Sequence, residues 1–306
     1  MKRVIVFGGT GWLGHNIVLE LRRQGAEVTI ATRGKKAAFL EEVADIPQVT
    51  VDKTDEAAMK DLFAHAHWDA VIDSVPTSAS LALVVKYAVG IDHYVHCSST
   101  GGYAPLPFIP CDETAPYLGF NQRAGWSKKA IVDAEALDHF NRAGFPATVI
   151  RPCYITGPGL LPLDNLGGRR PEFLPSLKAG KEMPLPDDGQ ALLQPIHVLD
   201  LARSFALALA HPQSIGQVYN ITLDHAVPLN RYLQLNAEAI GGTANIVHVP
   251  LAELLRQHPE DPVGLSFFAT HMCFTNAKAK AQLGFTPHCT PEEAIRETAR
   301  WGIEHL

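Results

Sequence analysis

The sequence lacks any uninterrupted apolar run of the roughly 18 residues that a membrane-spanning helix requires. Its opening Met-Lys-Arg and the apolar residues after it imitate a secretory leader, but the run breaks at Gly8 and Gly9 and contains no small-residue cleavage site. The five cysteines are scattered and include no CxxC pair, which argues against a metal centre or a redox motif. We therefore predict a cytoplasmic protein that binds no metal.

An excess of positive charge is also absent. The 306 residues include 26 lysines and arginines against 32 acidic residues, which gives a formal net charge of −6. Binding to a nucleic-acid backbone depends on clustered positive charge, so nucleic acid is a disfavoured partner. With 46% hydrophobic and 19% charged residues, the composition is that of a globular protein, and the length allows a large core.

A glycine-rich turn connects the first predicted strand, at 4–7, to a helix in which apolar residues recur at helical spacing. Three glycines stand at GxxGxxG spacing between the two elements, which lets the backbone approach a pyrophosphate and directs helix N–H groups at it. We predict that this turn binds a dinucleotide, the alternative being a tight turn without a ligand. The predicted cofactor residues here are Gly8, Thr10, Gly11, Trp12, Leu13 and Gly14.

The end of the second predicted strand, at 28–31, indicates which dinucleotide binds. An NAD site usually has an acidic residue here, roughly 20 residues after the glycines, that accepts hydrogen bonds from the ribose. This sequence has Arg33, Lys35 and Lys36 instead, and such residues can pair with the 2′-phosphate of NADP. We predict NADP in preference to NAD, with a solvated basic turn as the alternative.

Strand and helix patterns continue to alternate after this unit. Further strands are predicted to end at Asp52, before Ser74 and before Ser98, with helical patterns at 56–64 and 79–89 between them. Such alternation predicts an α/β fold with a doubly wound parallel sheet, or Rossmann fold. Ligands of such sheets bind at the carboxyl ends of the strands, where these three residues are expected.

The second half of the chain predicts a smaller unit. The segment 160–190 is rich in proline and glycine, a strand at 217–222 returns to the main sheet, and mostly helical patterns follow residue 229. Thr290, followed by Pro291 and two glutamates, is a good helix N-cap. We predict a dinucleotide-binding domain at 1–156 and about 190–225, and a mostly helical substrate domain at about 157–189 and 226–306.

Several motifs in order resemble the extended short-chain dehydrogenase/reductase family, which includes nucleotide-sugar epimerases and dehydratases. They are GGTGWLG, HCSSTGGY, SKKAIVDAEAL, IRPCYITGPG and PIHVLDLARSFALAL, and together they extend over nearly the whole chain. The resemblance implies that Asp52 contacts the adenine, with Lys53 beside it. It further implies that the rest of the cofactor is lined by Ser74, Val75, Pro76 and Tyr154.

The resemblance also implies catalytic roles. Ser99 would hydrogen-bond the substrate oxygen, and Lys128 would hold the nicotinamide ribose. The family's general acid/base is a tyrosine four residues before this lysine, and Ala124 stands at that position. A methyl group cannot transfer a proton, so we expect the usual chemistry to be reduced by roughly 10²- to 10⁴-fold or more. Three explanations remain open: another proton donor or none, loss of catalysis with retention of binding, or a deliberate replacement of tyrosine by alanine.

Three other tyrosines are candidate proton donors. Tyr103 follows the serine strand, Tyr117 precedes the lysine helix, and Tyr154 lies in the segment that flanks the nicotinamide in the family. We expect each to be a packing or loop residue, because tyrosine rings bury readily. Cys153 is likewise predicted to be a small buried residue and not a nucleophile.

The predicted substrate class follows from missing arginines, which nucleotide-sugar members of the family use to neutralise the diphosphate. Here the corresponding stretch is Leu192-Leu193-Gln194-Pro195, and a buried diphosphate without such partners would be strongly unfavourable. We predict a smaller polyol, sugar acid, lactone or ketone instead. Arg169 or Arg170 could bind an acidic group, or both could be solvated loop charges.

Two functions are therefore predicted from the sequence. The first is an NADP(H)-dependent oxidoreductase or epimerase-like enzyme in which Ser99 polarises the substrate oxygen and Lys128 orients the ribose. The second is a non-catalytic cofactor-binding or RNA-associated protein, since stem-loop-binding proteins of chloroplasts also resemble this sequence in the Arg-Gly turn. Relatives commonly dimerise through the helix predicted at 127–140, so a homodimer is an expectation.

Overall fold

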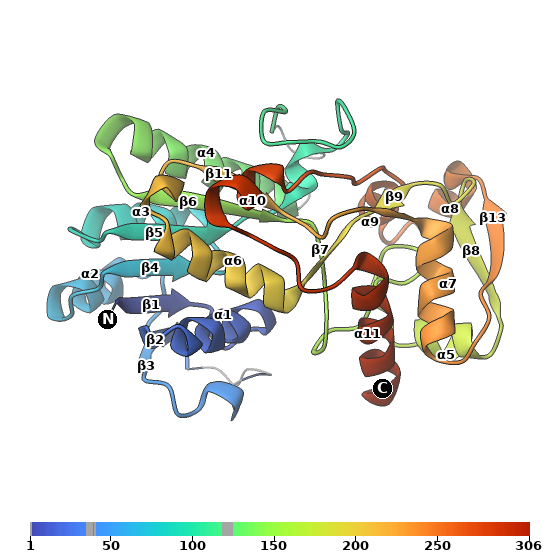
Figure 1. Cartoon of the computed structure of the whole chain (residues 1–306), viewed down its shortest axis with the longest axis horizontal. Helices are drawn as coiled ribbons and strands as arrows, with labels where there is room; N and C mark the ends of the chain where they lie inside the picture. Colours follow the sequence, from blue (N-terminus) through green and yellow to red (C-terminus); the bar gives the residue numbers. More distant parts are fainter. Residues whose placement is uncertain (1, 35–38, 40, 118–124) are drawn as a thin grey trace.

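A seven-stranded parallel sheet forms the larger part of this computed structural model, which describes residues 2–34, 39, 41–117 and 125–306 (Figure 1). The strands lie in the order β11-β6-β5-β4-β1-β2-β3, and every pairing between them is parallel. The sheet comprises β1 (Arg3–Phe7), β2 (Glu27–Thr32), β3 (Gln48–Thr50), β4 (Ala70–Asp73), β5 (His93–Cys97), β6 (Ala147–Pro152) and β11 (Val218–Ile221). The predicted fold class, a doubly wound α/β sheet, is confirmed.

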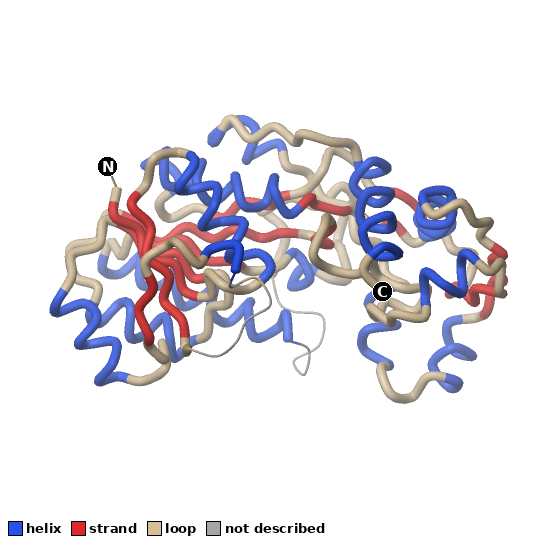
Figure 2. Tube along the Cα trace, turned by 90° about the horizontal axis from the view of Figure 1, so that it is seen from below, coloured by secondary structure: helices blue, strands red, loops and turns tan. Residues whose placement is uncertain are grey.

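Helices cover both faces of this sheet, which Figure 2 shows nearly edge-on. Because side chains alternate along a strand, Val4 and Val6 of β1 pack toward one face while Ile5 and Phe7 pack toward the other. One face is covered by α1 (Trp12–Arg23) and α6 (Val198–Ala210), and the other by α2 (Glu56–His65), α3 (Ser78–Tyr87) and α4 (Gly125–Ala143). The strand order reverses between β1 and β4, so the crevice for a ligand lies beside the glycine turn.

The second part of the chain has its own hydrophobic cluster, formed mainly by three helices. These are α5 (Phe173–Lys178), α7 (Leu229–Ala239) and α11 (Pro291–Glu304). Thr290 caps α11 as predicted, because its hydroxyl accepts from Glu293 N while Glu293 reaches back to Thr290 N. The remaining elements are β7 (Tyr154–Thr156), β8 (Glu182–Pro186), β9 (Leu192–Leu193), β10 (Pro195–His197), β12 (Val227–Pro228), β13 (Asn245–Val249), α8 (Leu251–Gln257), α9 (Pro262–Phe268) and α10 (Ala277–Leu283).

One helix of the predicted substrate domain packs on the other part of the molecule. Helix α10 contacts β11 and α6, and its buried Ala279 and Leu283 belong to the core on the α1 and α6 face of the large sheet (Figure 1). The predicted two-domain division otherwise stays a prediction. Within the described residues, no helix combines the length and the apolar character needed to cross a membrane.

Candidate active site

The glycine turn after β1 brings two backbone segments into contact closer than any side chain would allow. Gly8 has φ +80°, and a Cβ added to Gly14 would lie 1.9 Å from Gly8 O. The N-cap of α1 is Gly11, which has no capping side chain, so the first N–H groups of the helix face the crevice at the strand end. This geometry fits a pyrophosphate, as the predicted dinucleotide site requires.

The other residues of the turn have different surroundings. Thr10 is buried, and Leu13 packs against the hydrophobic core. Trp12 extends across the crevice, where its indole N–H donates to Pro158 O at 2.6 Å. Trp12 thereby connects the turn to the segment that follows β7.

The end of β2 carries an arginine and no acid. Arg33 is exposed, and it forms no ion pair with the residues that the structure describes. A guanidinium in this position can bind a 2′-phosphate, whereas a carboxylate would repel it. Lys35, predicted to assist, lies outside the described residues.

The ends of β3 and β4 contain a buried carboxylate that the sequence patterns did not single out. Asp73 is fully buried and accepts from Lys53 Nζ at 2.6 Å, Val75 N at 3.0 Å and Ser80 Oγ at 3.1 Å. Lys53, predicted at the adenine, is thus held at the end of β4. Asp52 is exposed and accepts from Thr54 N at 2.9 Å.

The segment after β4 forms one wall beside the glycine turn. Ser74 Oγ donates to Phe7 O at 3.0 Å, and a Cβ on Gly8 would lie 2.4 Å from that hydroxyl oxygen. Val75 is 61% exposed, so it is available to a ligand, and Pro76 is buried. The structure therefore brings this predicted cofactor segment against the turn, as the parallel register of β1 and β4 requires.

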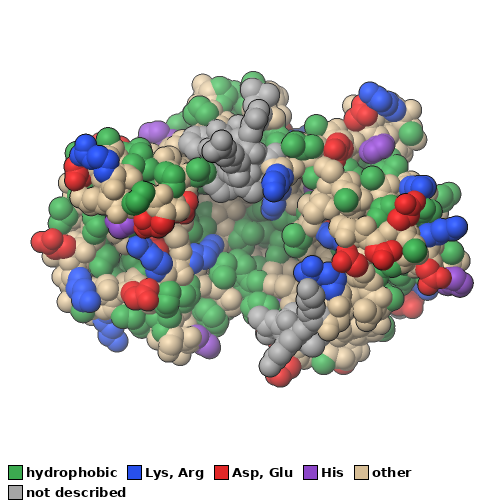
Figure 3. Space-filling view, turned by 180° about the vertical axis from the view of Figure 1, so that it is seen from behind, with side chains coloured by type: hydrophobic (Ala, Val, Ile, Leu, Met, Phe, Trp, Pro, Cys, Tyr) green, Lys and Arg blue, Asp and Glu red, His purple; other side chains and the backbone are tan. Residues whose placement is uncertain are grey.

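A cavity of about 400 Å³ lies between the two parts of the molecule and reaches the end of β5. Ser99, Thr100, Trp12 and Tyr154 all line it, so the predicted substrate serine and the turn residue share one space. Ser99 Oγ accepts from Gly101 N at 3.1 Å, which leaves its own O–H to donate to a ligand. The face shown in Figure 3 is hollowed between its two lobes, and hydrophobic side chains line the hollow.

Helix α4 presents a different lysine to β5 from the one predicted. Lys128 is exposed, whereas Lys129 is half-buried and its Nζ donates to Ser98 O at 3.0 Å. Counting back four residues from Lys129 leads to Gly125, the first residue of the helix, and not to Ala124, which lies outside the described residues. In either register no hydroxyl stands one turn before the lysine.

One turn after Lys129, a buried ion network ties α4 to the sheet. Asp133 accepts from His96 Nε2 at 2.8 Å, Ser98 Oγ at 2.7 Å and Arg151 Nε at 2.9 Å. Burial acts to raise the pKa of Asp133, but the bonds from His96 together with Arg151 and Ser98 outweigh it and lower that pKa. The helical periodicity of the sequence could have identified this inward face of α4, because residues 129 and 133 lie three or four positions from the buried Val132 and Ala136.

The three candidate tyrosines are all engaged in the structure. Tyr103 accepts a hydrogen bond from Arg151, and burial raises its pKa to about 12. The Tyr117 hydroxyl donates to Ser99 O, and Arg151 stacks 3.4 Å from the centroid of its ring. Burial raises the pKa of Tyr117 as well. Both are packing residues, as expected.

Tyr154 reaches the cavity with its ring, but its hydroxyl is occupied. It accepts from Leu163 N at 2.9 Å and lies 3.2 Å from the hydroxyl of Tyr232, which donates to Leu163 O. A phenol held this way has no proton to spare for a substrate. Cys153 is buried, and burial raises the pKa of its thiol, so the prediction of a packing residue is confirmed.

The two neighbouring arginines differ in their partners. Arg170 pairs with the buried Asp164 at 2.7 Å. Arg169 lines the cavity, and within the described part of the chain its guanidinium donates to two backbone carbonyls, those of Leu161 and Ile155. The site is thus reached by one cation that has no carboxylate partner among the described residues.

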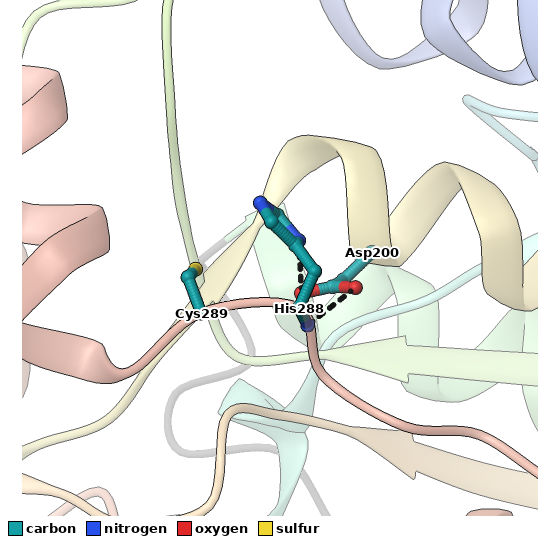
Figure 4. A group of neighbouring side chains, drawn as sticks. All are labelled: Asp200, His288 and Cys289. Carbon is teal, nitrogen blue, oxygen red and sulfur yellow. Dashed lines mark hydrogen bonds and ion pairs between the residues drawn. The ribbon is translucent and has the colours of Figure 1, made fainter.

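A second group of titratable residues, Asp200, His288 and Cys289, has the spacing of metal ligands (Figure 4). Asp200 is already satisfied, because Arg203 donates to it at 2.6 Å and His288 Nδ1 at 2.8 Å. Burial raises the pKa of Cys289 to about 12, so its thiol is protonated. We interpret the group as an anchor between α6 and the segment before α11.

Comparison with known proteins agrees with this geometry. Residues 4–82 and 77–222 match the model of the NAD dependent epimerase/dehydratase family. The chain is 24% identical to the chloroplast stem-loop binding protein of 41 kDa b of Arabidopsis thaliana, over 97% of this chain and 78% of that protein. It is 26% identical to 2′-dehydrokanamycin reductase of Streptomyces kanamyceticus, over 85% and 72%. The fold is similar to that of UDP-glucose 4-epimerase from Thermotoga maritima, with a TM-score of 0.78 and 20% identity over 99% of both chains.

Proposed function

Since the chain belongs to the NAD dependent epimerase/dehydratase family, we propose that it is an NADP(H)-dependent oxidoreductase that acts on a small ketone, lactone, sugar acid or polyol. The observation that carries this proposal is the shared cavity, in which Ser99 and Trp12 of the glycine turn face the same space. A substrate oxygen held at Ser99 would then lie beside a cofactor held by the turn.

Groups after β1, after β2 and on α4 would bind the cofactor. The N–H groups at the start of α1 would receive the pyrophosphate, and Arg33 would pair with the 2′-phosphate. Lys129, directed at the end of β5, is the better candidate than Lys128 for the nicotinamide ribose. When bound, the nicotinamide supplies or accepts a hydride at the substrate carbon.

Ser99 would polarise the substrate oxygen with its O–H, which has no acceptor among the described residues. The tyrosine that transfers a proton to that oxygen in the family is absent from this chain. Tyr154 lines the cavity but cannot replace it, because its hydroxyl is already hydrogen-bonded. We therefore expect hydride transfer by this chain to be slow and to draw its proton from solvent.

A nucleotide diphosphate fits this site poorly. The stretch Leu192-Leu193-Gln194-Pro195 lies where family members that bind nucleotide sugars have an arginine, and the Gln194 amide is fully used in packing. Its Oε1 accepts from Phe274 N at 2.6 Å, and its Nε2 donates to Leu223 O at 2.7 Å. A diphosphate here would lose its hydration and meet a single cation, Arg169, among the described lining residues.

The test combines cofactor titration with an assay of hydride transfer, followed as the change in absorbance of the reduced nicotinamide. We expect NADPH to bind more tightly than NADH, and Lys129→Met to weaken NADPH roughly 10-fold or more while Lys128→Met has little effect. Gly125→Tyr, which restores a phenol one turn before Lys129, should raise turnover of a small ketone roughly 10²-fold, and Ala124→Tyr should not.

Other outcomes would contradict the proposal in distinct ways. NADPH affinity without turnover in the original protein and in both tyrosine variants would favour the non-catalytic binding protein. An absence of affinity for NADPH and NADP⁺ alike would overturn the proposal. If Ala124→Tyr raised turnover more than Gly125→Tyr does, Lys128 and not Lys129 would be the lysine that binds the nicotinamide ribose.

A further inference from the structure

We propose that the cavity binds an organic carboxylate with an apolar or aromatic body, and that Arg169 pairs with the carboxylate. This inference rests on the proposed function for the location of the substrate, and it narrows the substrate class. It is supported by the position of Arg169, by the apolar character of the cavity wall and by the lack of acidic residues among the described residues of that wall.

Arg169 is held in place before any ligand binds. Its guanidinium donates to Leu161 O and, at 3.2 Å, to Ile155 O, and lies 5.2 Å from the centroid of the Tyr154 ring. Backbone carbonyls and an aromatic face orient a guanidinium without neutralising its charge. The N–H groups that remain can donate to both oxygens of a carboxylate, which suits the planar fork of arginine.

The rest of the cavity is mostly apolar. Trp12, Leu160, Phe267, Phe268 and Met272 line it, and no aspartate or glutamate lies among its described lining residues. Arg169 is the one charged side chain in that set. An apolar wall with one cation favours a ligand whose own surface is apolar apart from one negative group.

Two other ligand classes fit the wall less well. A polyol would leave several hydroxyls against leucine, phenylalanine and methionine side chains, and each unpaired hydroxyl costs free energy of binding. A diphosphate would bring more negative charge than a single guanidinium can neutralise, and the Gln194 amide is already engaged. A carboxylate with an apolar body pairs with Arg169 and places no hydroxyl against the apolar side chains of the wall.

The test compares 2-naphthoate with its neutral counterpart 2-naphthamide by calorimetric titration, without cofactor. We expect the original protein to bind the acid at least about 10-fold more tightly than the amide. Arg169→Gln keeps donors for the backbone carbonyls and removes the charge, so the two ligands should bind it equally. Arg256→Met removes an exposed arginine that pairs only with Glu253 in the described structure, so it should keep the preference.

Equal binding of acid and amide by the original protein would overturn the inference. So would a preference that survives in Arg169→Gln, or binding of UDP-glucose where neither naphthalene compound binds. Separate NADPH titrations of the same three proteins distinguish this failure from failure of the proposed function. An Arg169-dependent preference in a protein without NADPH affinity would refute the oxidoreductase and leave the carboxylate site standing.

Discussion

At position 14 only a hydrogen atom fits, and this gives a sharp prediction at the scale of one residue. Alanine there would place Cβ 1.9 Å from Gly8 O and 2.9 Å from Gly9 Cα, and backbone atoms cannot rotate away. Helix propensity alone would favour alanine by roughly 1 kcal/mol. We expect the overlap to dominate, so that Gly14→Ala lowers the free energy of unfolding by about 1–3 kcal/mol.

Denaturant unfolding measures this change, and Gly11→Ala is the matched control. At position 11 an added Cβ would lie 3.4 Å from Gly8 O, an ordinary contact, so stability should change little. NADPH affinity should fall with Gly14→Ala in the same experiment, because the turn can no longer close. A Gly14→Ala protein more stable than the original would contradict the account of the turn.

The neighbouring lysines Lys128 and Lys129 show that residue type alone does not decide which side chain reaches the site. The family's motif favours Lys128, since Ser99 and position 124 then have the usual separation. The orientation of α4 favours Lys129, because Val132 and Ala136 turn the same face inward. Neighbouring residues on a helix point about 100° apart, so a one-residue ambiguity in sequence is a large difference in space.

At the scale of elements, a buried histidine joins β5 to its neighbours. His93 lies 2.8 Å from Thr148 Oγ1 of β6 and 3.3 Å from Ser214 Oγ, and its exposure is 2%. Burial, with a smaller effect from Lys2, lowers its pKa from 6.5 to about 4. The neutral ring is therefore the form that the folded protein requires.

This histidine predicts how stability depends on pH. Between pH 6.5 and about 4 the unfolded chain binds the proton and the folded protein does not, so stability falls as the pH falls. The difference in pKa corresponds to about 3 kcal/mol lost across that range. Urea unfolding at several pH values should show a flatter profile for His93→Gln than for the original protein. Parallel profiles would show that His93 does not titrate as described.

At the scale of the whole molecule, Asp200 links α6 to the segment that leads into α11. Its buried carboxylate accepts from both the backbone N and the ring Nδ1 of His288 (Figure 4). It also accepts from Arg203. Removing it would leave these donors without their charged acceptor. We expect Asp200→Ala to lower the free energy of unfolding by roughly 2–3 kcal/mol.

Thermal and denaturant unfolding test the anchor. Asp200→Asn keeps an acceptor oxygen and should lose less stability than Asp200→Ala. Asp138→Asn breaks only the exposed pair with Arg142 and should be close to neutral. A chelator that destabilised the original protein would indicate instead that the cluster holds a cation.

The amino-acid sequence by itself determined the helices and strands and the glycine turn after β1. Alternating apolar runs and helical spacing are local patterns, and a glycine triplet between a strand and a helix fixes the conformation of its own turn. The α/β class and the turn at Gly8 and Gly14 therefore followed from residues near in sequence. Tertiary structure decided which partners the charged side chains near the site contact. Asp73, Lys129 and Arg169 acquire their partners from segments about 20, 31 and 8 to 14 residues away. Such contacts depend on how elements pack, because direction and burial, not residue type, set what a charged group can bind.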